Sequence, residues 1–382
     1  MIHPPAWAEI DLKALAHNFE QLKKLAGKNM SHAAGIMPVI KADAYGHGML
    51  QVAQTLGECG CKYLGVSNIS EAVTLRAAGF TQKILLFEST LARDAKDIID
   101  YELTPTVCAI EMAEALDHYA HEIGKQVPVH IKVDTGMGRL GVNEAQALDF
   151  VKALRDQCPN LILEGVYTHF PVADSDRDFT LSQMRRFRDI VYAMENHFIT
   201  FSYVHAGNSM GLGDYKTDLF NLARPGIMVY GIYPMTDLKT KINLKPVMQV
   251  KTKIIFVQPI AKGQGISYGH TFKAKEDMTV AVLPIGYSNG YLRSLSNKAF
   301  VLISGLRCPV IGRVTMDQVI IDVTPVGLSG RTPKIGDEAV ILGEQKGESI
   351  TADDVAQWAD TISYEIICAL GSRLPRKYFP QP

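Results

Sequence analysis

The first two-thirds of the chain contains eight short apolar segments, and this pattern constrains its fold more than any other feature. Each segment is apolar throughout instead of alternating, which is typical of parallel strands that are covered on both faces. Amphipathic, helix-like stretches separate the segments. Eight such units predict an α/β fold, a (β/α)8 TIM barrel. The segments lie at about residues 36–41, 63–67, 83–88, 104–108, 127–133, 162–168, 203–206 and 227–230.

The pattern changes after about residue 242, where strand-like segments are separated by Gly, Pro and Asn turns. This pattern predicts a second, mostly-β domain, interrupted by one helical stretch at about 352–370. We therefore expect a barrel domain over residues 1–242 and a C-terminal β domain over 243–382. An alternative assigns the first nine or so residues to packing with the C-terminal domain. The expected strands lie at 251–259, 279–284, 299–304, 308–314, 318–323 and 338–342.

Charge and cysteine content exclude several classes of protein. The 39 Lys and Arg residues nearly balance the 40 Asp and Glu residues, which argues against nucleic acid or an anionic membrane as the main partner. The six cysteines are scattered without a Cys-x-x-Cys pair, so we expect neither a structural metal site nor a disulfide framework. The sequence has no signal-like N-terminus and no apolar run near the roughly 18 residues of a membrane span. We expect a reduced, cytoplasmic protein.

Polar residues at the ends of the barrel strands are the candidates for chemistry, because TIM-barrel active sites lie at the carboxyl ends of the strands. The first segment ends in Lys41. A lysine directly after a buried strand is costly to desolvate unless it is paired or deprotonated, and a deprotonated amine is what Schiff-base chemistry requires. Alternatively, its amine reaches solvent at the barrel mouth while its stem covers apolar surface. The position alone leaves both interpretations open.

The surroundings of Lys41 resemble a known family. The segment Val39–Gly48 reads VIKADAYGHG and resembles the pyridoxal phosphate (PLP) lysine motif of the alanine racemases. Glu9–Leu12 is similar to the N-terminal signature of that family, and further similar motifs follow in order along the whole chain. These motifs are Lys132–Gly141, Arg224–Ile227, Ser267–Gly269, Ile285–Tyr287 and Met316–Gln318. The family fold is a PLP-binding barrel plus a β domain in a head-to-tail homodimer.

A cofactor phosphate needs a hydroxyl group and closely approaching backbone N–H groups. Asn208 and Ser209 follow the seventh segment, and Gly226 and Ile227 lie at the eighth, where TIM barrels commonly bind phosphate. Ser209 alone would be interpreted as an ordinary turn serine. The resemblance adds two phenols that contact the phosphate in the family, and these are Tyr45 and Tyr364.

Arg224 resembles the family arginine that pairs with the pyridine nitrogen of PLP. An arginine has five donors, no acceptor and a proton that it does not release, so it holds the ring nitrogen unprotonated. This weakens the ring as an electron sink and limits side reactions such as transamination. The alternative is a salt-bridged arginine at the barrel rim. The Arg-Pro-Gly sequence directly before the eighth segment favours the functional interpretation.

Racemisation removes the α-proton on one face and returns one on the other, so two acid–base groups must flank the cofactor. Lys41 can be only one of them. The resemblance implies that Tyr268 is the other, reaching the barrel of the partner subunit. An ordinary phenol, with a pKa of about 10, is a poor base at neutral pH and needs neighbouring positive charge or donors. His169 resembles the family histidine with this role that lies against the ring; alone, it would be interpreted as a core histidine.

The resemblance also implies how the substrate is bound. Arg139 matches the arginine that holds the amino-acid carboxylate, for which its fork geometry is suited. Met316 matches a backbone contact from the other subunit. Lys132 stands where many relatives carry a carbamylated lysine, so we expect a carbamate there or a bound anion such as chloride. A narrow entry channel that favours a methyl side chain is implied at Asp174, Tyr287, Arg293 and Arg313, together with Tyr364.

These observations predict an isomerase that interconverts L- and D-alanine by a two-base PLP mechanism and supplies D-alanine for peptidoglycan. One alternative is racemisation of another small amino acid such as serine, because a pocket discriminates an added hydroxyl by only about 1–3 kcal/mol. Another is a PLP decarboxylase of the same architecture, which needs an acidic or cysteine partner where this chain has Ser267–Gly269. The roughly 140 residues after the barrel argue against a barrel-only PLP-binding protein. A PLP-independent barrel enzyme is the remaining alternative.

Overall fold

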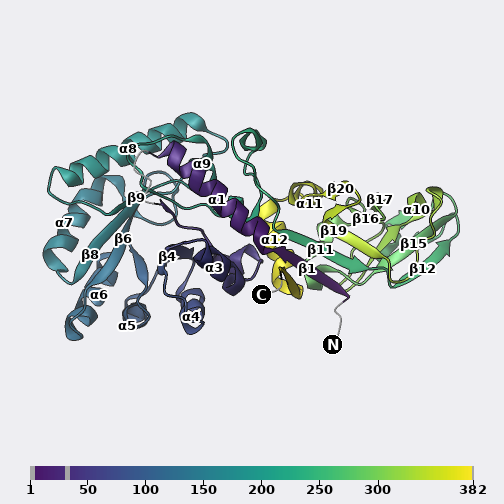
Figure 1. Ribbon diagram of the computed structural model, residues 1–382, viewed down its shortest axis with the longest axis horizontal. Coiled ribbons are helices and arrows are strands. Elements are labelled where there is room, and N and C mark those ends of the chain that lie inside the picture. The colour runs from purple at the N-terminus through teal and green to yellow at the C-terminus, as the bar shows by residue number, and fades with distance from the viewer. Residues whose placement is uncertain (1–4, 31–34, 381–382) are drawn as a thin grey trace. The chain divides into compact units, whose positions relative to one another are not determined.

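The computed structural model of the protein describes residues 5–30 and 35–380, and the chain divides into two compact units (Figure 1). The unit that we call the barrel unit comprises Leu15–Ala42 and Met49–Lys245. The unit that we call the C-terminal unit comprises Met1–Ala14, Asp43–Gly48 and Pro246–Pro382. The second half of the lysine motif therefore belongs to the C-terminal unit, although Lys41 itself belongs to the barrel unit.

The described residues of the barrel unit form a curled parallel sheet in the order β3-β4-β5-β6-β8-β9, with β7 (Val142–Asn143) added to β6. A further parallel pair, β2 and β10, joins the two edges. The amide of Gly65 donates to Pro38 at 3.0 Å on one side, and that of Asn221 donates to Val204 at 3.0 Å on the other. The predicted barrel is thus confirmed. The strands are β2 (Gly35–Ile36), β3 (Tyr63–Val66), β4 (Lys83–Ser89), β5 (Thr104–Val107), β6 (Val127–Asp134), β8 (Leu161–Tyr167), β9 (Tyr203–His205) and β10 (Leu222–Ala223).

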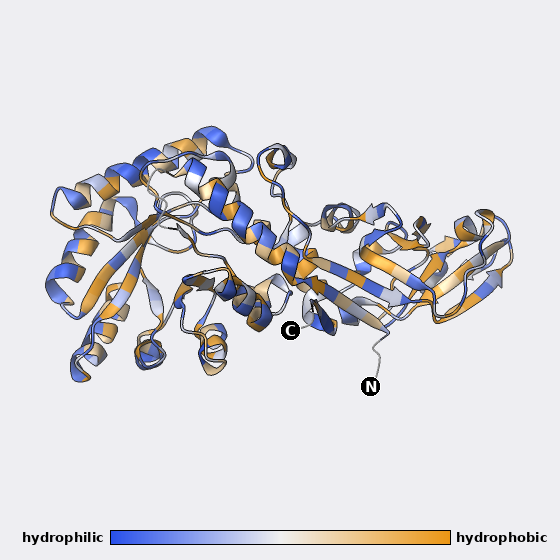
Figure 2. Cartoon of the chain, viewed as in Figure 1, coloured by the Kyte–Doolittle hydropathy of each residue, from blue (hydrophilic) through white to orange (hydrophobic). Residues whose placement is uncertain are grey.

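Helices lie around the outside of this sheet (Figure 1). The first, α1, begins after Asp11, whose carboxylate accepts a hydrogen bond from the Ala14 amide at 2.9 Å and caps the helix. Its apolar stripe of Leu15, Phe19 and Leu22 is buried. Figure 2 shows the same two-sided hydropathy on most of the helices. The helices are α1 (Leu12–Asn29), α3 (Met49–Glu58), α4 (Ile69–Ala77), α5 (Ala95–Asp100), α6 (Ile110–Glu122), α7 (Ala147–Gln157), α8 (Arg177–Glu195) and α9 (Ser209–Asp214), with 3-10 turns η1 (Ala92–Asp94), η2 (Glu144–Gln146), η3 (Ile227–Tyr230) and η4 (Thr236–Thr240).

The eighth strand differs from the sequence prediction. Residues 227–230 form the 3-10 turn η3, and the strand is β10, five residues earlier. Residues 227–230 are apolar because they are completely buried, and a buried turn has the same apolar pattern as a buried strand. Pro225 and Gly226 end the strand before this run begins. Arg224 consequently follows its strand directly, at the carboxyl end.

The C-terminal unit is mostly β, as predicted. Among its described residues, one sheet has the order β17-β16-β19-β11-β1-β21 with β20 added to β19, and a second has the order β12-β15-β18. β1 pairs antiparallel with β11 and parallel with β21. The strands are β1 (Ala6–Asp11), β11 (Met248–Lys253), β12 (Phe256–Ile260), β13 (Gly265–Ile266), β14 (Phe272–Lys273), β15 (Met278–Leu283), β16 (Phe300–Ile303), β17 (Leu306–Pro309), β18 (Val319–Asp322), β19 (Glu338–Gln345), β20 (Glu348–Ile350) and β21 (Arg376–Phe379).

The helical stretch predicted at 352–370 is two helices, α11 (Ala352–Ala359) and α12 (Ser363–Arg373). Asp360 adopts a left-handed conformation with φ of 59° and ends α11. A short helix, α10 (Thr324–Leu328), was not predicted. The 3-10 turns of this unit are η5 (Tyr268–His270), η6 (Tyr287–Asn289) and η7 (Arg293–Leu295).

Within residues 5–30 and 35–380, no helix is both long and apolar enough to cross a membrane. Over the same ranges, no three His, Cys, Asp or Glu side chains are grouped in a way that could hold a metal ion.

Candidate active site

The residues after Lys41 form a left-handed helical turn. In α2 (Lys41–Tyr45), residues Ala42 to Tyr45 have φ angles of 52° to 55°. A left-handed conformation costs roughly 1–2 kcal/mol for each residue that is not glycine, so this turn stores about 4–8 kcal/mol. Strained backbone of this kind persists only where surrounding contacts enforce it, and it is concentrated at functional sites.

The beginning of this turn is held by hydrogen bonds within the barrel unit, and its end by contacts within the C-terminal unit. In the barrel unit, the Glu71 carboxylate accepts from the Ala42 amide at 2.6 Å and from the Ser67 amide at 2.7 Å. In the C-terminal unit, Arg376 forms an ion pair with Asp43 at 2.5 Å, and it donates to the Gly46 carbonyl at 2.8 Å. The strained turn is therefore fixed at its beginning and at its end.

Close backbone packing provides a second restraint on the turn. A Cβ atom at Gly46 would lie 2.5 Å from the carbonyl oxygen of Ile367 in α12, and one at Gly371 would lie 2.2 Å from the carbonyl oxygen of Gly46. Gly46 also has a φ of 81°. Both positions therefore require glycine, because the turn and α12 are in backbone contact.

Tyr45 ends the turn and lies beside Tyr364 of α12. Their ring centroids are 6.2 Å apart. Tyr45 is buried, and burial followed by the neighbouring Tyr364 raises the pKa of its phenol. The hydroxyl of Tyr45 therefore stays protonated at neutral pH and acts as a hydrogen-bond donor.

Ser209 and the backbone of Gly226 and Ile227 lie together after the seventh and eighth strands. The hydroxyl of Ser209 accepts from the Gly226 amide at 3.0 Å and from the Met228 amide at 3.4 Å. The carboxamide of Asn208 caps α9 by accepting from the Gly211 amide at 2.9 Å. The structure thus brings the four predicted cradle residues together.

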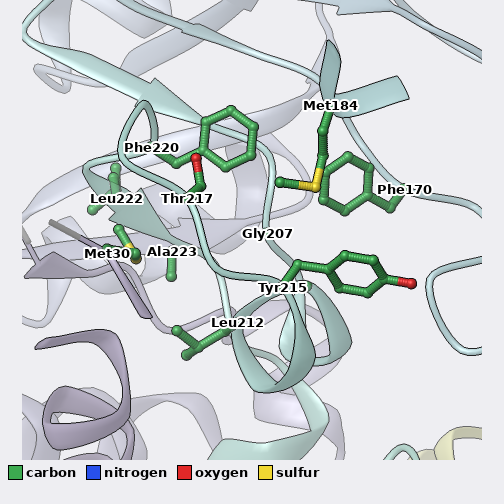
Figure 3. A pocket seen from close by; sticks show the side chains of 11 residues that line it. Met30, Phe170, Met184, Gly207, Leu212, Tyr215, Thr217, Phe220, Leu222 and Ala223 are labelled. Carbon is green, nitrogen blue, oxygen red and sulfur yellow. The ribbon is translucent and has the colours of Figure 1, made fainter. Parts of the chain in front are cut away.

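A small apolar cavity is lined in part by Gly207 and Gly211, which flank Asn208 and Ser209 in the sequence (Figure 3). Its volume is about 10 Å³, which is room for roughly one water molecule. Aromatic and aliphatic side chains surround it, and Gly207 lines one side. This cavity is too small to hold a substrate.

Arg224 is only 3% exposed. Its Nη2 atom donates to the carbonyl groups of Thr168 and Ala206 at 2.8 and 3.0 Å, and its Nη1 atom lies 2.6 Å from Nδ1 of His205. Burial lowers the pKa of Arg224 to about 10. The guanidinium is buried and bonded to carbonyl groups and an imidazole, so Arg224 does not lie at the barrel rim.

Positive charge converges on His169, which follows β8. The pKa of His169 is held well below its ordinary value, first by burial and then by four neighbouring cations. These cations are Arg224, Lys132, Arg139 and Lys41. The imidazole is therefore neutral, and the surrounding field favours anionic ligands.

Lys132 and Arg139 belong to β6 and the loop after it. Burial, followed by the charges of Arg224 and Arg139, lowers the pKa of Lys132 to about 8. The loop is fixed by the Asp134 carboxylate, which accepts from the amides of Met137 at 2.7 Å and of Arg139 at 3.1 Å. The side chain of Arg139 itself is exposed. The bonds to Asp134 thus fix the backbone of Arg139, from which its exposed side chain extends.

Another group of predicted residues lies on loops of the C-terminal unit. Tyr268 is 72% exposed in the single chain. The residue before it, Ser267, has φ of 59° and ψ of −175°, and its hydroxyl donates to the Arg313 carbonyl at 2.7 Å. The amide of Tyr287 donates to the Thr315 carbonyl at 3.0 Å, directly before Met316. Arg293 begins η7, and Asp174 is exposed in the barrel unit.

Two buried histidines next to Arg224 were missed by the sequence analysis. His205 contacts Arg224 directly, and its Nε2 atom lies 2.8 Å from Nδ1 of His130. His130 lies inside β6 and His205 ends β9, and both are fully buried. A polar residue inside a doubly covered strand needs a partner, and this was the signal that could have identified them.

The sequence and structure were compared with known proteins. The family model described as alanine racemase, N-terminal domain, matches residues 10–234, and the C-terminal domain model matches residues 247–378. The alanine racemase of Halothermothrix orenii is 42% identical over 98% of this chain and 97% of its own length. That of Methanococcus maripaludis is 37% identical over 99% of this chain and 100% of its own length.

Solved structures agree with these relatives. An alanine racemase of Clostridium difficile 630 superposes with a TM-score of 0.91 at 33% identity, covering 99% of this chain and 97% of its own. The alanine racemase from D-cycloserine-producing Streptomyces lavendulae gives 0.91 at 30% identity, covering 100% and 99%. The chain therefore belongs to the alanine racemase family of PLP-dependent isomerases.

Proposed function

We propose that this protein interconverts L- and D-alanine, with PLP bound at the carboxyl ends of the barrel strands. The observation that carries this proposal is the convergence of Lys41, Lys132, Arg139 and Arg224 on His169. A dianionic phosphate ester and an amino-acid carboxylate both need such positive charge. An amine to hold the cofactor is part of the same cluster.

The donor set fits PLP. The Ser209 hydroxyl and the backbone N–H groups of Gly226 and Ile227 would hold the phosphate, with the Gly226 N–H exchanging its bond to Ser209 Oγ for one to the phosphate. Asn208 supports them by capping α9. We assign the phenols of Tyr45 and Tyr364 to the same phosphate. We further propose that Arg224 faces the ring nitrogen and that the neutral His169 lies against the ring. Because Arg224 can only donate, it keeps that nitrogen unprotonated.

PLP supplies an electron-poor ring that makes the α-proton of a bound amino acid acidic. In our proposal, the Nζ atom of Lys41 takes or returns that proton on one face. The Oη atom of Tyr268 of the partner subunit does so on the other face. The large exposed fraction of Tyr268 in the single chain supports a role in a second subunit.

We propose that Arg139 binds the carboxylate of the substrate in a bidentate manner. The lowered pKa of Lys132 supports a carbamate at this position, since the neutral amine is the form that reacts with carbon dioxide. Met316 would contribute its backbone from the partner. The entry channel would be formed by Asp174, Tyr287, Arg293 and Arg313.

A homodimer with composite active sites follows from this assignment. The barrel domain of residues 1–242 would hold the cofactor, and the β domain of residues 243–382 would supply the second base to the partner. Besides Tyr268, the side chains of Tyr287 and Met316 are exposed in the single chain, which supports a partner-facing surface here. We propose that the enzyme acts in the cytoplasm and supplies D-alanine for peptidoglycan.

The test is to incubate the full chain with PLP and L-alanine in heavy water and to measure chirality and α-deuterium together. We expect D-alanine that carries deuterium at the α-carbon. The Lys41→Ala variant should give neither product nor exchange. L-alanine that remains unchanged and unlabelled with PLP-loaded protein would refute the proposal. Release of ethylamine and carbon dioxide would identify a decarboxylase instead, and a parallel incubation with L-serine measures the preference for alanine.

A further inference from the structure

A continuous chain of hydrogen bonds runs through the barrel interior from Arg224. The Nη1 atom of Arg224 lies 2.6 Å from Nδ1 of His205, and Nε2 of His205 lies 2.8 Å from Nδ1 of His130. The Nε2 atom of His130 lies 3.1 Å from the Tyr63 hydroxyl and 3.5 Å from Oε2 of Glu164. The Tyr63 hydroxyl donates to the same carboxylate oxygen at 3.2 Å. The chain thus connects a buried guanidinium with a buried carboxylate.

The direction of this chain is fixed by its two ends. An arginine can only donate, so Nδ1 of His205 must accept and its proton must be on Nε2. That proton points at Nδ1 of His130, which places the proton of His130 on Nε2 as well. The carboxylate of Glu164 can only accept, which suits this arrangement. Each imidazole is therefore held in one tautomer, and every hydrogen points toward Glu164.

Burial keeps the two imidazoles neutral. Both His130 and His205 are fully buried, and burial lowers the pKa of each. Although burial alone would raise the pKa of Glu164, hydrogen bonds from His130 and Lys83 lower it to about 2. Lys83 forms an ion pair with the other carboxylate oxygen, Oε1. A charged acceptor is therefore present at this end at neutral pH.

We propose that Glu164 is a positioning residue for Arg224. Through His130 and His205 it fixes the acceptor that holds Nη1 of the guanidinium, and so it sets the direction in which Arg224 presents its remaining donors. This inference rests on the proposed function in one respect, the assignment of Arg224 to the ring nitrogen of PLP. The tautomers of the two histidines do not depend on that assignment.

Substitutions at position 164 test separately whether His130 needs a hydrogen-bond acceptor there and whether that acceptor must be charged. Glu164→Met removes the acceptor while it keeps a side chain of similar length. The Nε2 atom of His130 then keeps only the Tyr63 hydroxyl as a partner, which can donate as well as accept. Glu164→Gln combined with Lys83→Met restores a neutral acceptor and removes the donor that would compete for its single oxygen. If Glu164 acts as the terminal acceptor, the double variant recovers what Glu164→Met loses.

The first measurement is the tautomeric state of the buried histidines, by 15N NMR of the [15N]histidine-labelled full chain with and without PLP. We expect Nε2-protonated His130 and His205 in the wild-type chain in both forms. In Glu164→Met the bias from the acceptor end of the chain is lost, so we expect a fraction of both residues in the Nδ1-protonated form, in which Arg224 no longer donates to His205. The double variant should return to the wild-type pattern. The matched control is Glu9→Gln, since Glu9 also pairs with a lysine and an aromatic donor but belongs to the C-terminal unit.

The second measurement uses the cofactor. We expect Glu164→Met to shift the pH at which the visible absorbance of bound PLP changes, and to lower kcat/KM about tenfold, which corresponds to one hydrogen bond to a charged group. Glu9→Gln should change neither quantity.

Two results would overturn the inference: a wild-type chain with Nδ1-protonated His205, or a folded Glu164→Met variant with wild-type tautomers and cofactor spectrum. If Glu164→Met does not fold, the Glu164→Gln/Lys83→Met double variant serves as the test: histidine tautomers that differ from those of the wild-type chain would also contradict the proposal. Failure of the wild-type protein to bind PLP or racemise alanine would refute the proposed function, while the tautomers measured without PLP would still test the hydrogen-bond chain.

Discussion

Replacing Lys132 with methionine tests the electrostatics of the site most directly. Lys132 is only 4% exposed, and burial and its arginine neighbours lower its pKa from 10.5 to about 8. This corresponds to a penalty of about 3 kcal/mol on the charged amine. At neutral pH the neutral, reactive fraction is therefore roughly 300 times that of an ordinary lysine. A carbamate would place an anion between the same arginines, where the positive lysine is unfavourable.

The unfolding free energy of the unmodified protein should depend on pH in a specific way. Below pH 8 the lysine is protonated in both the folded and the unfolded chain, so the folded state carries the full penalty. Between about pH 8 and 10.5 the unfolded chain binds more protons at Lys132, so the unfolding free energy rises with pH. Without carbon dioxide, the wild-type protein should gain about 3 kcal/mol relative to Lys132→Met over this interval. With saturating carbon dioxide, this gain should disappear.

The assay combines denaturant unfolding with 13C NMR after equilibration with labelled bicarbonate. We expect one carbamate resonance in the wild-type chain and none in Lys132→Met. The variant should also show a roughly tenfold higher KM for alanine, because it cannot form the carbamate that, in our proposal, orients Arg139 through a hydrogen bond. The reasoning is wrong if the folded wild-type chain shows no carbamate at pH 8, or if the resonance persists in the variant. A dependence of KM on chloride without a carbamate would identify a bound anion instead.

Three further substitutions test other parts of the proposal. Tyr268→Phe should lower kcat/KM by roughly 10²–10⁴-fold, and equally for both enantiomers, because the equilibrium constant between them is one. Lys41 should still catalyse the loss of α-deuterium from one enantiomer. Loss of this exchange from both enantiomers would contradict two separate bases. Arg224→Glu should favour a protonated ring nitrogen and increase transamination, measured as pyruvate formed per alanine racemised; an unchanged ratio would contradict the role of this residue. Gly371→Ala should lower the unfolding free energy by about 1–3 kcal/mol, because its Cβ would lie 2.2 Å from a backbone oxygen. Gly27→Ala in α1, where a Cβ meets nothing within 4 Å, is the matched control and should not be destabilising.

The barrel could be predicted because its strands are buried on both faces, so their apolar runs stand out from the amphipathic helices. The same signal misplaced the eighth strand, since the 3-10 turn Ile227–Tyr230 is equally buried. Likewise, apolar periodicity continues through α11 and α12 and does not reveal the left-handed residue Asp360 between them. An apolar segment indicates a buried segment, but it does not determine the backbone conformation where a helix, a turn and a strand would all be buried there.

The candidate site was predictable to the extent that it lies at strand ends. Lys41, Lys132 and Arg224 converge because the carboxyl ends of barrel strands meet at one face. His130 and Glu164 lie within strands instead, and a sequence alone does not show which polar residue in a strand faces another across the barrel. Their pairing depends on the register of β6 with β8, which only the folded sheet defines.

The left-handed turn shows why a part of the site has no local sequence signal. Residues Ala42 to Tyr45 include no glycine, although each adopts a conformation that disfavours a side chain. The contacts that enforce it come from Arg376, 330 residues away from Gly46 along the chain, and from the backbone of α12. The strain of about 4–8 kcal/mol next to Lys41 is therefore offset by contacts within the C-terminal unit, in addition to the bond that Glu71 accepts from Ala42. A barrel that ended at Lys245 would lack these contacts, and the turn would relax toward right-handed backbone. The second domain is thus needed to shape the lysine motif of its own chain, in addition to the role of Tyr268 in the partner's site that we propose.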